Sequence, residues 1–202
     1  EKFSITKVIN ITFSENDVAV SGNIPYTKNG AHLTINSTDS KVGYIVSGKC
    51  SNGSLKIYSE KKFQLMLSGL ELTNPAGPAI NIQTGKTVYF TIDDNTTNSL
   101  CDGATYNAPT IADEDQKGTL FSEGQLIFNG YKDGSGILNV TSLGGHGICS
   151  DDYIRIRSGN INIIKAAKDG FHTNEKFIVG RTATASPSVT VNATNDGIDC
   201  GK

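Results

Sequence analysis

Three copies of a short glycine-centred sequence decide the fold: His146-Gly147-Ile148-Cys149-Ser150-Asp151-Asp152, Asp169-Gly170-Phe171-His172-Thr173-Asn174-Glu175 and Asp196-Gly197-Ile198-Asp199-Cys200-Gly201-Lys202. Their first glycines are 23 and 27 residues apart. The residues between the copies form short alternating runs of apolar and polar side chains, without helical spacing. A repeat of this length built from short strands is typical of one coil of a β-solenoid. The sequence therefore predicts an all-β chain, wound as a single-stranded parallel β-helix with turn insertions.

Apolar residues recur at every second position in many short segments, as expected for strands with one buried face. The segments are Leu33/Ile35, Leu55/Ile57, Phe63/Leu65/Leu67, Val88/Phe90/Ile92, Leu126/Phe128, Leu138/Val140, Ile154/Ile156, Ile161/Ile163 and Val189/Val191. Aligning the repeats predicts two apolar columns along the axis, one with Ile82, Leu120, Ile148, Phe171 and Ile198, the other with Val88, Leu126, Ile154 and Phe177. A β-sandwich would lack such a register, and a propeller would need a period of about 40 or more.

The composition supports one sizeable domain with many turns. The chain has 202 residues, of which 22 are Gly, 5 are Pro and none is Trp, and 37% are hydrophobic. The net charge of −2 gives no basic surface for nucleic acid. No stretch approaches the ~18 apolar residues of a membrane span. Cys50, Cys101, Cys149 and Cys200 lack the Cys-x-x-Cys spacing, and we interpret them as small buried hydrophobic residues.

The domain is expected to cover residues 1–202 and to continue beyond residue 202 in the natural protein. The first two copies of the repeat are followed by strand-like segments, Tyr153 to Ile156 and Lys176 to Val179, whereas the third ends the chain. An open last coil would leave unpaired backbone groups. One segment, Asp93 to Lys117, is polar and rich in turn residues, and it is expected to form a loop inserted between two coils.

A family resemblance rests on several stretches of the chain. They are Asn74 to Asp94, with Pro75-Ala76-Gly77-Pro78-Ala79-Ile80 and Lys86-Thr87-Val88-Tyr89-Phe90-Thr91-Ile92, then Leu100-Cys101-Asp102-Gly103-Ala104-Thr105-Tyr106, then Gly118-Thr119-Leu120-Phe121-Ser122. Together with the glycine repeats they resemble the bacterial "carbohydrate-binding domain" family of secreted right-handed parallel β-helices, similar in fold to pectate lyases. The resemblance implies a secreted or cell-surface protein, binding of cellulose-like or acidic plant polysaccharide, bound calcium, and no demonstrated catalytic turnover.

Oxygen ligands for calcium collect around the third glycine turn. Asn195, Asp196 and Asp199 lie within five residues of one another, and Asp169 falls in the column of Asp196. Stacked carboxylates repel each other unless a cation lies between them, which favours a calcium site at Asp169, Asn195, Asp196 and Asp199. The alternative is that these side chains only accept backbone hydrogen bonds at the turns.

Two further metal sites are conceivable from the sequence. Asp151 and Asp152, stacked near Asn174 and Glu175, form a second and weaker candidate for calcium. Zinc is disfavoured, because His146 and His172 fall in different columns and no closely spaced histidine motif is present.

The functional prediction is non-catalytic binding of a polysaccharide by a monomer. Tyr131 and Tyr153 are the best-placed tyrosines, and Arg155, Arg157 and Lys165 are further candidate ligand-binding residues. Two other classes stay open. A calcium-dependent polysaccharide lyase would take its base from Lys165, Lys168, Arg155 or Arg157, and a surface stalk or adhesin segment would need no ligand. Hydrolysis by Asp151 and Asp152 is disfavoured, because neighbouring strand residues point to opposite faces.

Overall fold

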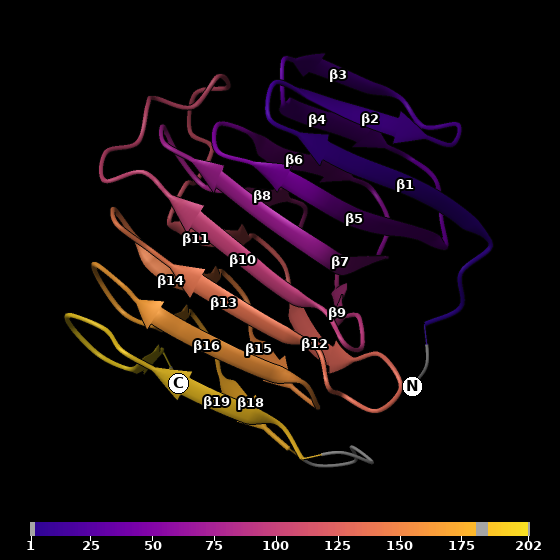
Figure 1. Ribbon diagram of the computed structural model, residues 1–202. Helices are drawn as coiled ribbons and strands as arrows, with labels where there is room; N and C mark the ends of the chain where they lie inside the picture. The colour runs from indigo at the N-terminus through magenta and orange to yellow at the C-terminus, as the bar shows by residue number, and fades with distance from the viewer. Residues whose placement is uncertain (1–2, 181–185, 202) are drawn as a thin grey trace.

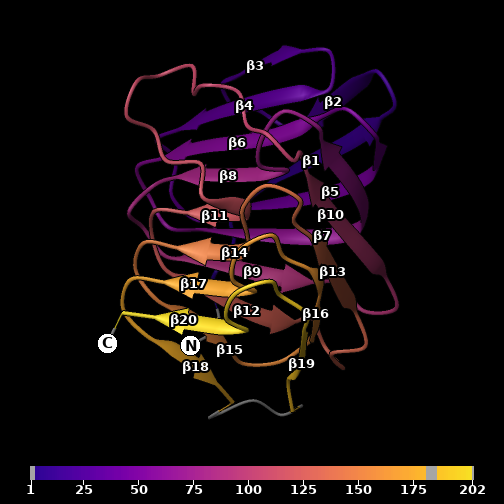
Figure 2. The ribbon, with the colours of Figure 1, turned by 90° about the vertical axis from the view of Figure 1, so that its left-hand side faces the viewer.

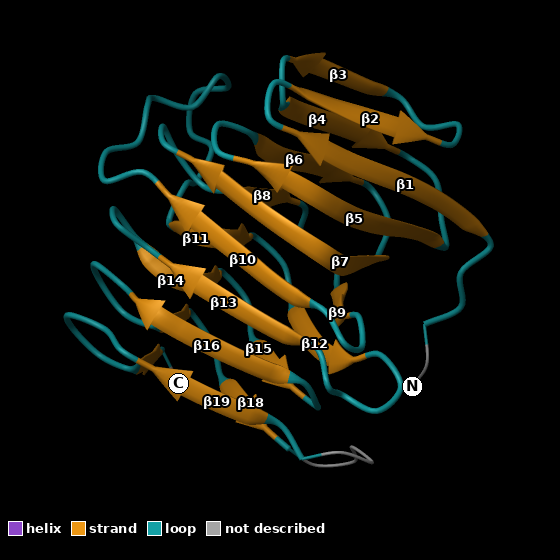
Figure 3. Ribbon diagram, viewed as in Figure 1, coloured by secondary structure: helices purple, strands orange, loops and turns teal. Residues whose placement is uncertain are grey.

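The computed structural model describes residues 3–180 and 186–201, which form strands and turns (Figure 3). The all-β prediction is confirmed: no helix occurs among these residues. Consequently, no described segment has the helical length and apolar character needed to cross a membrane. The strands form two large sheets, one of eight and one of twelve strands.

The eight-stranded sheet stacks its strands one above the other along the molecule (Figure 2). In spatial order its strands are β20 (Ile198–Cys200), β17 (Phe171–Thr173), β14 (His146–Ser150), β11 (Gly118–Ser122), β8 (Ile80–Gln83), β6 (Ser54–Ser59), β4 (His32–Ser37) and β3 (Tyr26–Asn29). Its neighbours pair in parallel, except the antiparallel pair β3 and β4.

The twelve-stranded sheet curls over two sides of the molecule and joins them at β7 (Phe63–Asn74). One side continues through β9 (Val88–Ile92), β12 (Leu126–Gly130), β15 (Ile154–Ile156) and β18 (Phe177–Val179). The other continues through β10 (Thr97–Asp102), β13 (Ile137–Thr141), β16 (Asn160–Lys165) and β19 (Ser188–Val191). Beyond β7 lie β5 (Val42–Cys50), β1 (Lys7–Ser14) and β2 (Asp17–Ser21), which completes the sheet (Figure 1).

From β7 onward the strands recur in threes, because every third strand along the chain pairs in parallel with its predecessor. The chain therefore advances by stacking equivalent turns, as the glycine repeats indicate. The N-terminal end differs from the prediction of an all-parallel winding: β1 pairs antiparallel with β2, and β3 pairs antiparallel with β4. These hairpins lie where the first turn of the stack would otherwise leave unpaired strand edges.

One predicted column is confirmed in full and the other needs a correction. Val88, Leu126, Ile154 and Phe177 are partners in successive strands. Leu120, Ile148, Phe171 and Ile198 are likewise in register, but Leu120 pairs with Ile80. The placement of Ile82 in this column is wrong by two residues, since Ile82 pairs with Ser122. Every residue of β8 is buried, so the alternation could not distinguish the two isoleucines.

The expected loop from Asp93 to Lys117 is partly a strand. Residues 97–102 form β10, which pairs in parallel with both β7 and β13. Its polar sequence concealed it: Leu100 is its one buried apolar residue, whereas Asn98 and Asp102 are buried through hydrogen bonds.

The remaining loop, residues 103–117, is attached to the eight-stranded sheet. Glu114 forms an ion pair with Lys56 and accepts a hydrogen bond from Tyr58, both on β6. The backbone carbonyl of Asp115 accepts hydrogen bonds from Asn81 and Gln83 on β8. The loop is therefore held against two strands that precede it in the chain.

The four cysteines are all free thiols. Cys50 and Cys149 are buried, as predicted, whereas Cys101 is half-buried and Cys200 is exposed. The interpretation of all four as buried hydrophobic residues is therefore right for two of them.

Candidate functional site

A groove of about 1180 Å³ crosses the outer face of the twelve-stranded sheet over β5, β7, β9 and β12. Its floor consists of outward-facing columns that alternate with the apolar core columns. Gln64 and Tyr89 are partners in one column, and Met66 and Thr91 are partners in the next. Asn129 extends the second column as the partner of Thr91. The same alternation that buries one face of each strand thus supplies this face with a regular row of side chains.

Aromatic rings line two parts of the groove. Phe3 stacks on Tyr89 with 4.9 Å between ring centroids, so the N-terminal segment forms one wall. This segment runs down the side of the sheet to the level of β9 and β12 (Figure 1). Tyr131 follows β12 and is 49% exposed. The ammonium group of Lys132 lies 5.0 Å from the centre of the Tyr131 ring, a cation–π distance.

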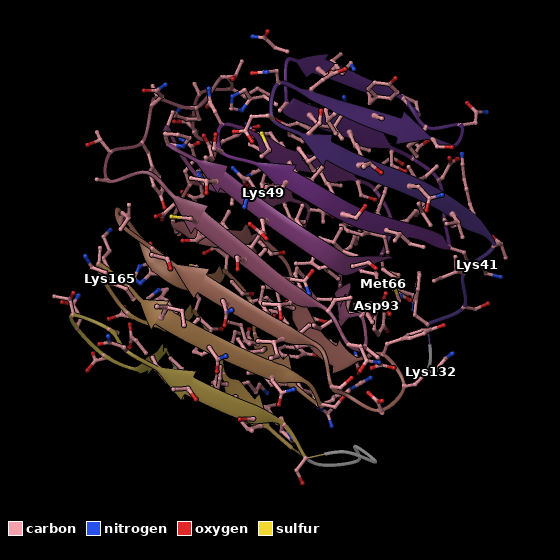
Figure 4. The ribbon with its side chains drawn as sticks, viewed as in Figure 1. Lys41, Lys49, Met66, Asp93, Lys132 and Lys165 are labelled. Carbon is pink, nitrogen blue, oxygen red and sulfur yellow. The ribbon has the colours of Figure 1, made fainter. Side chains whose placement is uncertain are left out.

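Polar groups converge beside these rings. Asp93 and Met66 point toward the same region of the groove, near Lys132 (Figure 4). The Asp93 carboxylate accepts a hydrogen bond of 2.6 Å from the hydroxyl of Ser68, which fixes its orientation. Arg157 lines the groove at its far side. The groove therefore combines apolar rings with hydrogen-bond donors, acceptors and one charge of each sign.

The structure brings only part of the predicted ligand-binding set together. Tyr131 and Arg157 line the groove, whereas Tyr153, Arg155 and Lys165 do not. Arg155 lies on the same side of the sheet, as the partner of Ile127 on β12. Lys165 ends β16, on the other side of the sheet, and its side chain lies at the opposite edge of the molecule from Asp93 (Figure 4).

The sequence interpretation missed Phe3, Gln64, Met66 and Tyr89 as groove residues. The period-two pattern contains three of them, because they occupy the outward positions between core residues of β7 and β9. The stacking of Phe3 on Tyr89 had no signal in the sequence.

A second cluster of functional side chains gathers at the repeated glycine turn. His146 on β14, Asp169 before β17, His172 on β17 and Asp199 on β20 come from three adjacent strands of the eight-stranded sheet. Asp169 Oδ2 lies 3.0 Å from Nδ1 of His146 and 3.5 Å from Nδ1 of His172. Asp199 Oδ2 lies 2.9 Å from Nδ1 of His172. The imidazole rings stack with 4.4 Å between their centroids.

The surroundings keep His146 neutral. Burial, and next the electrostatic influence of the neighbouring His172 ring, lower the pKa of His146 to about 4, although the carboxylate of Asp169 opposes this shift. Its Nδ1 accepts a hydrogen bond of 3.3 Å from the backbone N–H of Asp169. At neutral pH this nitrogen therefore carries a lone pair directed into the cluster.

At the turn where calcium is predicted, the candidate ligand atoms include nitrogens as well as oxygens. Asp169 and Asp199 contribute oxygens as expected, but two of the four converging atoms are imidazole nitrogens. Calcium requires six to eight oxygen ligands. Asn195 and Asp196 have exposed side chains, and Asp196 approaches Asp169 through its backbone N–H, 3.1 Å from Oδ1. These residues do not form a calcium-type set of ligands.

At the second predicted calcium site, Asp151 and Asp152, the ammonium group of Lys117 already provides a positive charge. The ammonium of Lys117 lies 2.7 and 2.8 Å from the two carboxylate oxygens of Asp151, and it also pairs with Asp115. Burial alone would lower the pKa of Lys117, but its bonds to Asp115 and Asp151 raise it, so the side chain stays charged. The backbone carbonyl of Asp152 accepts a hydrogen bond from the Thr173 hydroxyl. The Asp151 carboxylate therefore serves a contact within the protein, whereas Asp152 makes such contacts through its backbone groups.

The four candidate bases for a lyase do not share one face. Arg155 belongs to β15, which pairs with β12 and β18, and Arg157 directly follows that strand. Lys165 ends β16, which pairs with β13 and β19, and Lys168 follows in the next turn. This arrangement assigns no catalytic base.

Comparisons with known proteins agree with the observed architecture. Residues 29–202 match the model of a family described as "Carbohydrate-binding domain-containing protein". A protein of that description from Acetivibrio thermocellus is 25% identical over 122 residues, which are 59% of this chain and 41% of that protein. The chain thus spans less than half the length of this relative. The solved structure of a polysaccharide lyase-like protein from C. thermocellum superimposes with a TM-score of 0.72 at 17% identity, covering 95% of this chain and 94% of that one. At this identity the likeness concerns the fold alone.

Proposed function

Since the chain belongs to the family of carbohydrate-binding domain-containing proteins, we propose that it binds a polysaccharide without cleaving it, in the groove over β5, β7, β9 and β12. The observation that carries the proposal is the exposed ring of Tyr131 in a groove that also contains Asp93 and Arg157, whereas Tyr89 is only 9% exposed beneath Phe3. Sugar rings offer apolar faces to aromatic side chains and hydroxyls to polar ones. A groove that supplies both in a regular row suits an extended polymer.

The spacing of the groove side chains supports a repeating ligand. Gln64 and Tyr89 occupy equivalent positions on neighbouring strands, as do Met66, Thr91 and Asn129. Neighbouring strands lie about 4.8 Å apart, so the side chains of the groove floor repeat at that step, with Gln64 and Asn129 as the more accessible polar groups. Without tryptophan in the chain, we expect polar, partly water-mediated contacts and modest affinity.

Replacing Tyr131 by alanine should weaken polysaccharide binding, because its ring is the exposed aromatic surface of the groove, at 49% exposure. We expect a loss of about fivefold to thirtyfold, the range for an aromatic contact residue worth roughly 1–2 kcal/mol. Affinity electrophoresis or calorimetry with soluble plant polysaccharides measures it. Tyr26→Ala is the matched control, since Tyr26 is 42% exposed on β3, outside the groove. Equal affinities of the Tyr131 and Tyr26 variants would contradict this placement of the binding face.

If the ligand is an acidic polysaccharide, we expect the basic side chain of Arg157 to favour it over a neutral one. Replacing Arg157 by glutamine should weaken binding of a uronic-acid polymer up to about fivefold at low salt, the range of a solvent-exposed ion pair. Binding of a neutral glucan should change less, and the difference should shrink as salt is added. Lys165→Gln is the control, because Lys165 lies outside the groove. If both polymers lose the same affinity, the groove does not select for charge.

For the fold, we propose that the stacked parallel strands form a single right-handed parallel β-helix. The parallel pairing of every third strand supports it, and connections between parallel strands are right-handed in about 98% of cases. Export to the cell exterior or the bacterial surface is proposed from the family resemblance, and cell fractionation tests it. Calcium binding stays a prediction, and glycan binding in the groove does not depend on it.

A further inference from the structure

The side chains of His146, Asp169, His172 and Asp199 form a cluster. They come from three neighbouring strands of the eight-stranded sheet, one from each of three successive coils. His146 belongs to β14, His172 to β17 and Asp199 to β20, while Asp169 lies in the turn that leads into β17. His146 and His172 appear in different columns of the sequence, but stacking of neighbouring turns brings both Nδ1 atoms to the same carboxylate. The cluster lies on the eight-stranded sheet, whereas the groove lies on the twelve-stranded one.

The nitrogen–oxygen distances within the cluster are similar to the distances between neighbouring ligands of a tetrahedral zinc ion. Four ligands bonded at 2.0–2.1 Å to a tetrahedral zinc ion lie about 3.3 Å from one another. The observed separations are 3.0 Å for His146 and Asp169, 3.5 Å for His172 and Asp169, and 2.9 Å for His172 and Asp199. One potential ligand atom from each of His146, Asp169 and His172 lies within 4.8 Å of the others. A divalent ion therefore needs only small movements to bind His146, Asp169 and His172. Asp199 lies outside this group of three and approaches it at His172 Nδ1, so its partly exposed side chain would have to rotate to supply the fourth ligand.

Hydrogen bonds within the protein satisfy the atoms of this cluster only in part. The buried Nδ1 of His172 has no hydrogen-bond partner, although the Asp199 oxygen lies only 2.9 Å away, because the alignment is unsuitable. Nδ1 of His146 accepts the backbone N–H of Asp169 and lies 3.0 Å from Oδ2 of the same residue, a second acceptor, so a metal bound there would replace this hydrogen bond. A cation between Nδ1 and Oδ2 converts the repulsion between these two acceptors into attraction to the ion.

The Asp169 carboxylate is held in the orientation that a metal ligand requires. Its Oδ1 accepts the backbone N–H of Asp196, which leaves Oδ2 directed at the two histidines. Outer hydrogen bonds of this kind are typical of metal-binding carboxylates. Asp169 and Asp199 together also supply two negative charges, equal in magnitude to the charge of a divalent ion. Lys168, in the same turn, contributes an opposing positive charge.

We propose that His146, Asp169, His172 and Asp199 bind one zinc ion, which clamps β14, β17 and β20 together. Two imidazoles and two carboxylates are donors that zinc accepts, whereas calcium would find only two of its preferred oxygens. With four protein ligands the ion is structural and leaves no open position for chemistry.

The test is a zinc titration of the untagged, metal-stripped protein, followed by thermal melting and by Co²⁺ absorption. We expect one Zn²⁺ per chain and a rise in Tm of about 5–10 °C at a hundredfold excess over Kd. Co²⁺ should give the intense visible bands of a tetrahedral N/O site. His172→Gln and Asp169→Asn should each weaken binding at least tenfold. His32→Gln is the matched control, because His32 lies on β4 and its ring contacts Ser54.

Three results would overturn the proposal. The first is no Zn²⁺ binding at about 100 μM metal by a protein with native circular dichroism. The second is an equal loss of binding in the His32 variant. The third is a rise in Tm with Ca²⁺ that exceeds the rise with Zn²⁺ and disappears in Asp169→Asn, which would indicate an oxygen-ligated calcium site. Because each variant lies outside the groove, unchanged glycan binding separates failure of this proposal from failure of the proposed function.

Discussion

Replacing Asn98 by alanine should lower the free energy of unfolding by about 4 kcal/mol, because several buried polar groups would lose their partners. The Asn98 side chain is fully buried, at 0% exposure, on the core-facing side of β10. Its carbonyl oxygen accepts the backbone N–H groups of Gly69 and Leu70, each at 2.9 Å. Its amide donates to the Thr96 hydroxyl and to the Ile137 carbonyl. Urea-induced equilibrium unfolding measures the loss.

The position of Asn98 explains why the effect is large. Gly69 and Leu70 lie where β7 passes from one side of the twelve-stranded sheet to the other, so their N–H groups need a partner outside the ladder. Asn36→Ala provides the matched control, since Asn36 is exposed on the neighbouring sheet in β4. It should change the stability by no more than about 0.5 kcal/mol. A similar small change in the Asn98 variant would show that water replaces its four bonds.

Asn98 also shows where prediction from sequence reached its limit. Apolar alternation correctly predicted the strands that carry Val88, Leu126 and Ile154, because each of these side chains is buried by the hydrophobic effect alone. β10 is buried through hydrogen bonds of Asn98 and Asp102, which carry no periodic apolar signal. A polar strand inside a predicted loop is therefore the expected kind of error.

In the candidate sites, too, the sequence predicted features that follow from strand register and missed those that depend on how side chains are oriented. The sequence placed Asp169 and Asp196 in one column, and the bond from the Asp196 N–H to Asp169 agrees with that register. The meeting of His146 and His172 depends on side chains that reach across columns, which strand register alone cannot indicate. Tyr131, predicted from the sequence as an exposed candidate, is exposed and lines the groove, whereas Tyr89 resembles a core residue until the two sides of its strand are distinguished.

Replacing Gly48 by alanine should be severely disruptive, because it combines a backbone clash with a left-handed φ, with a loss of at least about 4 kcal/mol or failure to fold. Gly48 has a φ of +97°, and a Cβ at this position would lie 2.1 Å from the carbonyl oxygen of Phe13. That oxygen belongs to β1, which pairs with β5 at this very residue, so it cannot move without separating the strands. Urea-induced unfolding measures the loss, or soluble yield where the variant does not fold.

Gly69→Ala isolates the steric part of this effect. Gly69 also has a positive φ, +75°, but a Cβ there would meet no atom within 4 Å. It should lose only about 1 kcal/mol, the backbone cost of a left-handed conformation without a clash. The difference between the two variants then measures the contact between β1 and β5. Equal losses would mean that β1 can shift away from β5, and that the N-terminal wall of the groove, which precedes β1, is not fixed by this pairing.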